Sequence, residues 1–251
     1  MTPRIKNMTA GCTVGADYAR RLMELAVSRG ASATMLAERA GLHPEDLRDH
    51  DARVPLAAFI ALMRAGKVLC DDAALALHFG EMVDVVETSI VGLIGRSCAT
   101  LAEAFEQMNR YGRLVIEVDL GTRDRYQLVR AADGLWIVDT RTNPNDFPEL
   151  TESSFARMVC TSRRFGKPEF VKAVHVTHPE PAYRAEYDRI FQVPVVFESD
   201  HNALVTDPAW MALPPTRDPG ERLPRYAFGI LSAHAEALLE KLESSKSTRG
   251  R

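Results

Sequence analysis

The sequence predicts an α+β protein in which an N-terminal helical layer, residues 17–113, packs on an antiparallel or mixed sheet, residues 114–206. Up to position 113, apolar residues recur at the three- and four-residue spacing of helices, most clearly over residues 56–63. After that position they alternate in steps of two, which is the period of a half-buried strand. A seven-residue apolar repeat after Pro224 adds a C-terminal linker helix.

Start and stop signals divide the helical half into separate helices. Residues 1–16 are expected to form a flexible tail, after which Asp17 opens a helix that ends near Gly30. Further along, Thr100 and Glu103 form a capping-box pattern, in which each side chain satisfies a backbone N–H group at the helix start. The chain therefore enters its sheet region from a well-defined helix.

The segment 32–49 has the spacing of a helix-turn-helix, with Gly41 in the turn. Its second helix would carry three carboxylates, Glu45, Asp46 and Asp49, against a single arginine. Carboxylates are repelled by the phosphates that line a DNA groove, and the net charge of -3 gives the chain no basic surface. We therefore expect a structural helical hairpin here and no direct DNA binding by this chain.

The sheet is predicted to centre on a three-stranded meander. Residues 114–120 alternate apolar and polar side chains, residues 126–129 do so again, and turns are expected at 121–124 and 132–134. The third strand, 135–140, is apolar on both faces, which favours a position in the middle of the sheet.

Three more strands are expected after the meander. One strand is expected at 170–177, and a final hairpin is expected to pair residues 193–197 with residues 203–206.

Composition excludes several classes of protein. The first 14 residues lack the apolar region of a secretion signal, and no run of about 18 apolar residues indicates a membrane span. The four cysteines are scattered without a C-x-x-C spacing, which favours free thiols in a reducing cytoplasm. No nucleophile elbow, metalloprotease helix or complete phosphate loop occurs, so we expect no catalytic residues, no metal site and no cofactor.

A ligand cleft is expected between the helical layer and the sheet. The candidate side chains are large and mostly apolar, which favours a small apolar or amphipathic effector over a sugar, because a sugar requires several clustered polar groups. The predicted ligand-binding residues are Phe59, Met63, Leu93, Tyr111, Ile116, Trp136, Phe155 and Met158.

The last helix carries an apolar seam at alternating spacings of three and four residues. A free amphipathic helix must bury such a seam, either against a second copy of the chain or against its own domain. We expect a homodimer, with folding back as the alternative, and the predicted dimerisation residues are Phe228, Leu231, Ala235, Leu238 and Leu242.

Several segments together resemble the N-terminal sensor domain of AraC-type transcriptional regulators, in the subgroup labelled arabinose-binding by name only. They are Leu36–Leu42, Asp51–Leu56, Thr100–Phe105, Tyr111, Tyr187–Phe197 and Leu213–Pro219. The resemblance implies an effector-binding domain at 17–220 and a linker and dimerisation helix at 221–251. Members of this family continue into two helix-turn-helix units, so it also implies that the full-length regulator binds DNA and that the protein is not an enzyme.

Two other classes of function stay open on the residues alone. A haem or gas sensor would need an axial ligand, for which His78 is the leading candidate. A small-molecule enzyme would need a titratable cluster, and the groups near the predicted sheet are Glu117, Asp119, Asp139 and His175.

Overall fold

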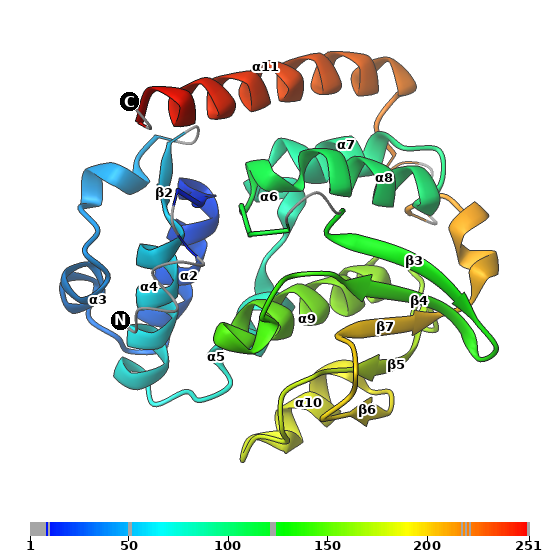
Figure 1. Ribbon diagram of the computed structural model, residues 1–251, viewed down its shortest axis with the longest axis horizontal. Helices are drawn as coiled ribbons and strands as arrows, with labels where there is room; N and C mark the ends of the chain where they lie inside the picture. Colours follow the sequence, from blue (N-terminus) through cyan, green and yellow to red (C-terminus); the bar gives the residue numbers. More distant parts are fainter. Residues whose placement is uncertain are drawn as a thin grey trace.

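The structure is a computed structural model that describes residues 9, 11–49, 52–120, 124–216, 218, 220 and 222–249. Its α+β architecture confirms the predicted fold class (Figure 1). The helices are α2 (Ala16–Ser28), α3 (Ala33–Ala40), α4 (Leu56–Leu69), α5 (Leu75–Met82), α6 (Val85–Thr88), α7 (Ile90–Ser97), α8 (Leu101–Tyr111), α9 (Pro148–Arg164), α10 (Arg184–Phe191) and α11 (Arg225–Arg249). The strands are β1 (Thr13–Gly15), β2 (Arg53–Pro55), β3 (Tyr126–Ala131), β4 (Gly134–Asp139), β5 (Val171–His175), β6 (Val195–Val196) and β7 (Ala203–Thr206), and short 3-10 turns are η1 (Pro44–Leu47), η2 (Gly112–Leu114), η3 (Pro144–Asp146) and η4 (Pro208–Ala212).

The main sheet of the described residues is mixed and has the order β3-β4-β7-β5-β6. Every neighbouring pair is antiparallel except β5 and β6, which are parallel. β4 lies inside the sheet, as its apolar sequence predicts. The expected hairpin of 193–197 with 203–206 is wrong, because β5 lies between its two strands: Val174 is paired with Val195 on one side and with Leu204 on the other.

The predicted first strand of the meander, 114–120, is also wrong. The chain leaves α8 through η2, and Ile116 makes one isolated bridge to Val14. Two backbone hydrogen bonds tie the segment to β1, from Gly15 N to Val115 O at 2.8 Å and from Glu117 N to Thr13 O at 2.9 Å. These bonds to the N-terminal part of the chain replace a ladder with β3. Of the turn expected at 121–124, residues 121–123 lie outside the described residues.

Helix α9 connects the two halves of the core. Its buried Phe155 and Val159 pack with Ile137 and Leu204 of the sheet. On its other side α9 packs against α5, where a Cβ atom on Gly80 would lie 2.2 Å from the carbonyl oxygen of Ser153. Gly80 therefore allows a close crossing of α5 and α9. The N-terminal helices thus reach the sheet through α5 and α9.

The helix-turn-helix spacing at 32–49 does not produce a recognition helix. Helix α3 ends at Ala40 and is capped by Gly41, whose φ of 64° is left-handed, and the next element is the single 3-10 turn η1. The Asp46 carboxylate accepts a hydrogen bond from the His43 backbone N–H at 2.8 Å and so caps this turn. The expected helical hairpin is therefore shortened to one helix and one turn.

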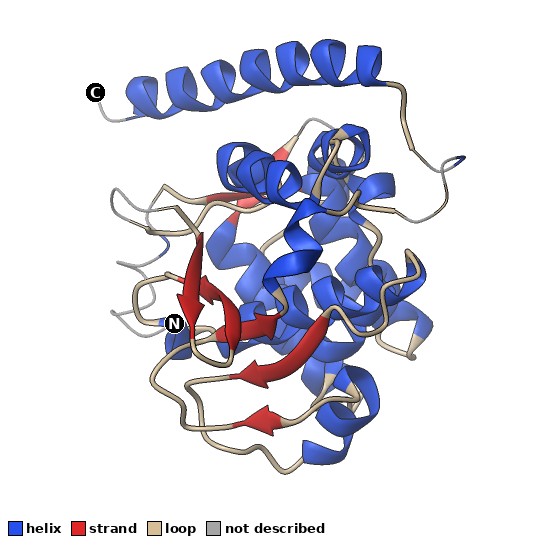
Figure 2. Cartoon of the chain, turned by 90° about the vertical axis from the view of Figure 1, so that its right-hand side faces the viewer, coloured by secondary structure: helices blue, strands red, loops and turns tan. Residues whose placement is uncertain are grey.

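Helix α11 lies across one end of the molecule, above α7 and α8 (Figures 1 and 2). Its Ala235 is fully buried with Ile94 and Tyr111, and Phe228 and Leu231 pack against the same cluster. Leu242 is 5% exposed, and Leu238 is half-buried. The seam therefore packs on its own chain, which is the folding-back alternative.

Among the described helices none is long and apolar enough to cross a membrane.

Candidate functional site

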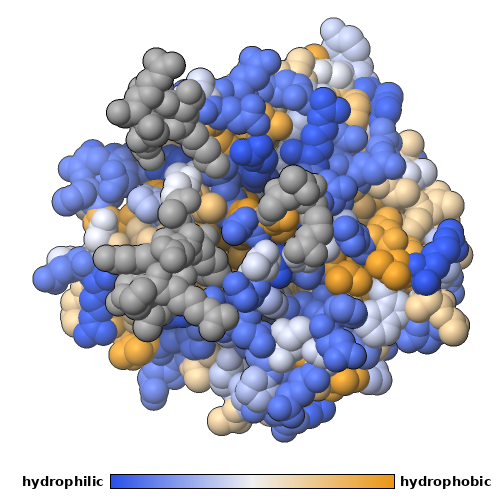
Figure 3. All heavy atoms as spheres, viewed as in Figure 1, coloured by the Kyte–Doolittle hydropathy of each residue, from blue (hydrophilic) through white to orange (hydrophobic). Residues whose placement is uncertain are grey.

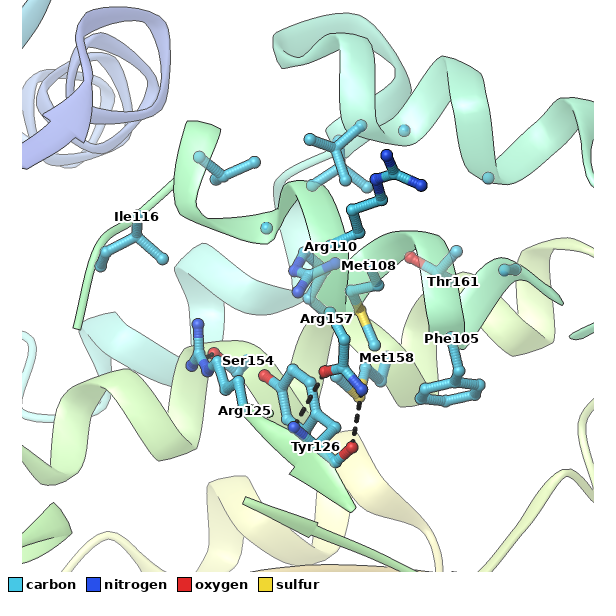
Figure 4. Close-up of a pocket in the computed structure, with 18 of the residues that line it drawn as sticks. Phe105, Met108, Arg110, Ile116, Arg125, Tyr126, Ser154, Arg157, Met158 and Thr161 are labelled. Carbon is cyan, nitrogen blue, oxygen red and sulfur yellow. Dashed lines mark hydrogen bonds between the residues drawn. The ribbon is translucent and has the colours of Figure 1, made fainter. Parts of the chain in front are cut away.

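A cavity of about 730 Å³ lies between α7, α8 and α9, and the irregular segment 112–120 forms part of its wall. Figure 4 shows side chains from α8, α9, β3 and this segment pointing into the space. A volume of this size suits a small organic molecule. The face of the molecule shown in Figure 3 is mainly hydrophilic, and its largest group of hydrophobic residues lies at the right-hand side.

Most of the cavity wall is apolar. The helical spacing of α8 directs one of its faces inward, and α9 supplies a second face at spacings of three and four residues. Gly92 sits where a Cβ atom would be 2.3 Å from the carbonyl oxygen of Val85, so α7 approaches α6 closely at the wall. The apolar lining comprises Val85, Val86, Val91, Leu101, Ala104, Phe105, Met108, Val115, Ile116, Val118, Leu120, Met158, Phe165, Phe170 and Pro215.

One corner of the cavity is polar, and we call Tyr18, Arg125, Tyr126, Ser154 and Arg157 the polar corner. Arg125 donates to Ser154 Oγ at 3.0 Å, and its guanidinium carbon lies 5.0 Å from the Tyr126 ring centre. In Figure 4 these two residues and Tyr126 lie toward the Ile116 end of the cavity, whereas Phe105 lies at the other end. The site thus has one polar end and one apolar end.

The position of Tyr126 is set by a backbone clamp. The side chain of Asn109 on α8 donates to the Tyr126 carbonyl at 2.8 Å and accepts from the Tyr126 N–H at 3.0 Å. Both bonds are drawn in Figure 4. The clamp joins the edge strand β3 to α8 across the cavity, which holds the polar corner against the apolar wall.

Burial and neighbouring charges act in opposite directions on the pKa values of the polar corner. Burial raises the pKa of Tyr18, while the positive charges of Arg157 and Arg125 act in the opposite direction. For Arg125, burial alone would lower the pKa of the guanidinium, but Tyr126 and Asp139 beside it raise the pKa above its ordinary value. Arg125 therefore stays charged at the cavity wall.

Three polar atoms of the corner are buried and have no hydrogen-bond partner in the described part of the protein. They are Arg125 Nε, Arg157 Nε and the hydroxyl of Tyr126. Burying such a group without a partner costs roughly 1–3 kcal/mol. The polar corner therefore has unused capacity to donate hydrogen bonds.

The structure places the eight predicted ligand-binding residues in different environments. Ile116 and Met158 line the cavity. The other six do not: Phe59 and Met63 lie in the N-terminal core, Phe155 in the sheet core, Tyr111 against α11, and Leu93 half-buried on α7. Trp136 lies on the other face of β4, where its ring is 4.5 Å from that of His175.

The prediction missed the basic residues of the cavity. Arg157 lies on the same face of α9 as Ser154, Met158, Thr161 and Ser162, all of which line the cavity. Their spacing of 3, 1, 3 and 1 could have been recognised as one helix face with a charge in it. Arg125 had no such signal, because its position depends on the pairing of β3 with β4.

The side chains considered for haem binding and enzymatic catalysis have other partners or places. His78 contacts Asp72 through Nδ1 at 2.7 Å and Glu186 through Nε2 at 2.9 Å, so both ring nitrogens are engaged. Of the titratable candidates, Glu117 and Asp119 line the cavity, whereas Asp139 and His175 do not. Among the described residues no three or more His, Cys, Asp or Glu side chains are placed to hold a metal ion.

Comparisons with known proteins identify relatives of the chain. Residues 30–215 match a family described as "Arabinose-binding domain of AraC transcription regulator, N-term". The "Ornithine utilization regulator" of Pseudomonas aeruginosa is 26% identical over 200 residues, which make up 78% of this chain and 56% of that protein. The chain thus spans about half the length of this curated relative. The crystal structure of the transcriptional regulator CdpR from Pseudomonas aeruginosa is similar with a TM-score of 0.48 and 17% identity, over 70% of this chain and 53% of that one.

Proposed function

The chain belongs to the family of arabinose-binding N-terminal domains of AraC transcription regulators, and we propose that it senses a small effector in the cavity between α7, α8 and α9. The observation that carries the proposal is the cavity itself, whose apolar walls end in a polar corner. Ligand sites in proteins combine these two features, because apolar walls supply affinity and a few polar groups fix orientation.

An amphipathic effector fits this lining best. Its apolar part would lie against Phe105, Met108 and Met158, and its polar part at the corner formed by Arg125 and Arg157. This proposal keeps the expected apolar or amphipathic effector and adds Arg125 and Arg157 as its polar contacts, which the sequence analysis did not identify. Regulators of this family are not enzymes, and we assign the chain no catalytic role.

A cavity-filling substitution tests the proposal. In the full 251-residue chain, Ala104→Trp would place an indole in the cavity wall, whereas Ala185→Trp adds the same group to an exposed position on α10. A thermal-shift screen of small organic acids, alcohols and sugars should find compounds that raise the melting temperature of the wild type. The same compounds should stabilise Ala185→Trp and fail to stabilise Ala104→Trp, while equal stabilisation of both variants would refute the site.

A second candidate effector is an amino acid. The relative named above is a regulator of ornithine utilisation, and the wall of this cavity contains carboxylates as well as guanidinium groups, among them Glu117, Asp119 and Asp124. Such an effector would pair its ammonium groups with these carboxylates. Ornithine therefore belongs in the screen, and stabilisation by ornithine without stabilisation by amphipathic acids would favour this class.

We propose that α11 transmits the state of the cavity to the DNA-binding part of the full-length regulator. Arg110 and Arg113 line the cavity and also pair with α11, with Glu236 at 2.6 Å and with Glu243 at 2.9 Å. An effector that draws either guanidinium inward weakens its bond to α11. Because exposed ion pairs contribute little each, such a change shifts the docking of α11 modestly and reversibly.

The homodimer remains a proposal that rests on the family resemblance. The inner face of α11 is used within the chain, so a dimer that keeps this fold needs another surface. Tyr226 is 82% exposed and Ile230 is 58% exposed, and the two lie one turn apart on the outer face of α11. We propose that these side chains contribute to the dimer, and that the regulator acts in the cytoplasm, where it binds DNA through its other domain.

A further inference from the structure

The polar corner differs from the rest of the cavity in its balance of charge. One of its two arginines, Arg125, lies near a carboxylate, Asp139, whose Oδ2 is 3.8 Å from Arg125 Nη2. Asp139 lies closer to Arg141, at 2.9 Å from Nε, and accepts a second hydrogen bond from the Arg141 backbone N–H. The Asp139 charge is therefore shared between two arginines, and the polar corner keeps an excess of positive charge.

Arg157 is the main source of this excess. It makes no hydrogen bond or ion pair within the described part of the chain, and its Nε is buried. Among the carboxylates of the cavity wall, Glu117 is already engaged, because it accepts from the Thr13 hydroxyl at 2.7 Å and lies 3.5 Å from Arg113. Within the structure described, no acidic side chain pairs with Arg157.

We propose that the polar corner binds a carboxylate group of the effector, with Arg157 as the charge partner and Tyr126 and Arg125 as further donors. The unpartnered N–H groups of two arginines and the hydroxyl of Tyr126 are all donors, and a carboxylate is an acceptor with two oxygens. One uncompensated guanidinium matches a single negative charge. The partly buried setting strengthens the pairing, because solvent screens it less than it does at the surface.

This inference rests on the proposed function, because it assumes that the effector enters this cavity. It adds the chemical class of the effector: a carboxylic acid with an apolar body. The body would extend from the polar corner toward Phe105 and Met158, which Figure 4 shows on the far side of Arg157 from Arg125. The carboxylate anchor also holds for an amino-acid effector, whose acid group would occupy the same place.

Matched acid and alcohol probes test the anchor. Octanoate and 4-phenylbutyrate carry an ionised carboxylate at pH 7.5, and octan-1-ol and 4-phenylbutan-1-ol present similar bodies without charge. Binding to the full chain is measured by calorimetric titration. We expect both acids to bind the wild type at least about tenfold more tightly than their alcohols, since a charge-assisted hydrogen bond contributes roughly 1.5–3 kcal/mol.

Three substitutions separate the anchor from general effects. Arg157→Gln should weaken the binding of both acids at least about tenfold and leave the binding of the alcohols unchanged. Tyr126→Phe, which removes only a hydroxyl, should weaken the binding of the acids by a smaller factor than Arg157→Gln does. Arg130→Gln removes a positive charge from an exposed position on β3 that does not line the cavity, and should leave the preference for acids intact.

The outcomes distinguish the anchor from the site. Equal binding of acids and alcohols, or acids unaffected by Arg157→Gln in a folded variant, would overturn the anchor and leave the proposed site standing. If Arg157→Gln does not fold, the Tyr126→Phe result and the acid-to-alcohol ratio decide the question. Failure of all four probes to bind the wild type, together with no effector found for the cavity, would overturn the proposed function itself.

Discussion

The hydroxyl of Tyr111 donates a hydrogen bond of 2.6 Å to Glu236 Oε1, which joins the end of α8 to the middle of α11. Burial raises the pKa of the Tyr111 phenol, and the Glu236 carboxylate raises it further. The phenol therefore remains a protonated donor at neutral pH. The same carboxylate oxygen lies 2.6 Å from Arg110. This contact fastens α11 to α8, a helix that also lines the cavity.

Removal of the Tyr111 hydroxyl should loosen α11. Tyr111→Phe leaves the ring in the cluster with Ile94 and Ala235 but deletes the donor to a charged acceptor, at an expected cost of about 1–2 kcal/mol in the free energy of unfolding. Urea denaturation and amide hydrogen exchange over 225–249 measure the change. Glu240→Gln, at an exposed position of the same helix, should have no effect on either measurement. Equal exchange rates in the two variants would refute the fastening role.

A charge on the inner face of α11 should release the helix. Ala235 is fully buried, so Ala235→Glu places a carboxylate among Ile94 and Tyr111 without a partner, at a cost of more than about 2 kcal/mol. Ala237→Glu introduces the same charge at an exposed position two residues away and serves as the matched control. We expect fast amide exchange throughout α11 in Ala235→Glu alone. Slow exchange in both variants would show that this packing does not hold the helix.

Glu152 should make the stability of the protein depend on pH. Burial raises the pKa of this carboxyl, although Tyr187 and Tyr183 donate to Oε1 at 2.6 and 2.8 Å and act in the opposite direction. The folded state therefore binds the proton more tightly than the unfolded state. The contribution of Glu152 to stability is fully present below its ordinary pKa, near 4.5, and is lost as the pH rises through the folded pKa.

Denaturation at several pH values checks this sign. From pH 4.5 to 8 the free energy of unfolding of the wild type should fall relative to that of Glu152→Gln, whose side chain does not titrate. Glu180→Gln alters an exposed carboxylate and should follow the wild-type curve. A difference between wild type and Glu152→Gln that is constant with pH would contradict the raised pKa.

The 251-residue chain should not bind duplex DNA at physiological salt. Its net charge is -3, and the turn η1 that replaces a recognition helix exposes Glu45 and Asp46. A mobility-shift assay at sub-micromolar protein measures this. A shifted band that fades as salt is added would show that the chain has a DNA-binding surface of its own.

The proposed dimer surface predicts that two substitutions on α11 reduce the particle in solution from two chains to one. Light scattering of the wild type at tens of micromolar should report two chains, and Tyr226→Glu combined with Ile230→Glu should report one, because two charges replace exposed apolar contacts. Leu128→Glu with Val129→Glu changes two exposed apolar residues on the edge strand β3 and should leave the dimer intact. A monomeric wild type would refute the homodimer.

Helix positions were predictable because their signals are local. Leu56, Phe59, Ile60 and Met63 repeat at helical spacing, and all four are buried in α4. The side chain of Thr100 accepts from the Glu103 N–H at 3.1 Å, as its capping pattern predicts. Such signals act within a few residues of the chain, so nearby sequence is sufficient to recognise them.

Strand pairing was less predictable, because it joins distant residues. The alternation at 114–120 is real, and Ile116 and Glu117 are both buried, yet the segment bonds to β1 about 100 residues earlier. The alternation of side chains indicates an extended, half-buried segment, but it does not determine with which strand the segment pairs. The insertion of β5 between β6 and β7 was missed for the same reason.

The amino-acid sequence by itself determined the α+β class, the helices and the resemblance to AraC-type sensor domains, because these depend on periodicity and on segments in a fixed order. The tertiary structure alone decided where the cavity lies and what lines it. Arg125 and Arg157 are 32 positions apart and meet because β3 pairs with β4 and α9 packs on that sheet. Phe59 and Arg157 both lie on amphipathic helices, and helix packing buries the first in the core and directs the second into the cavity.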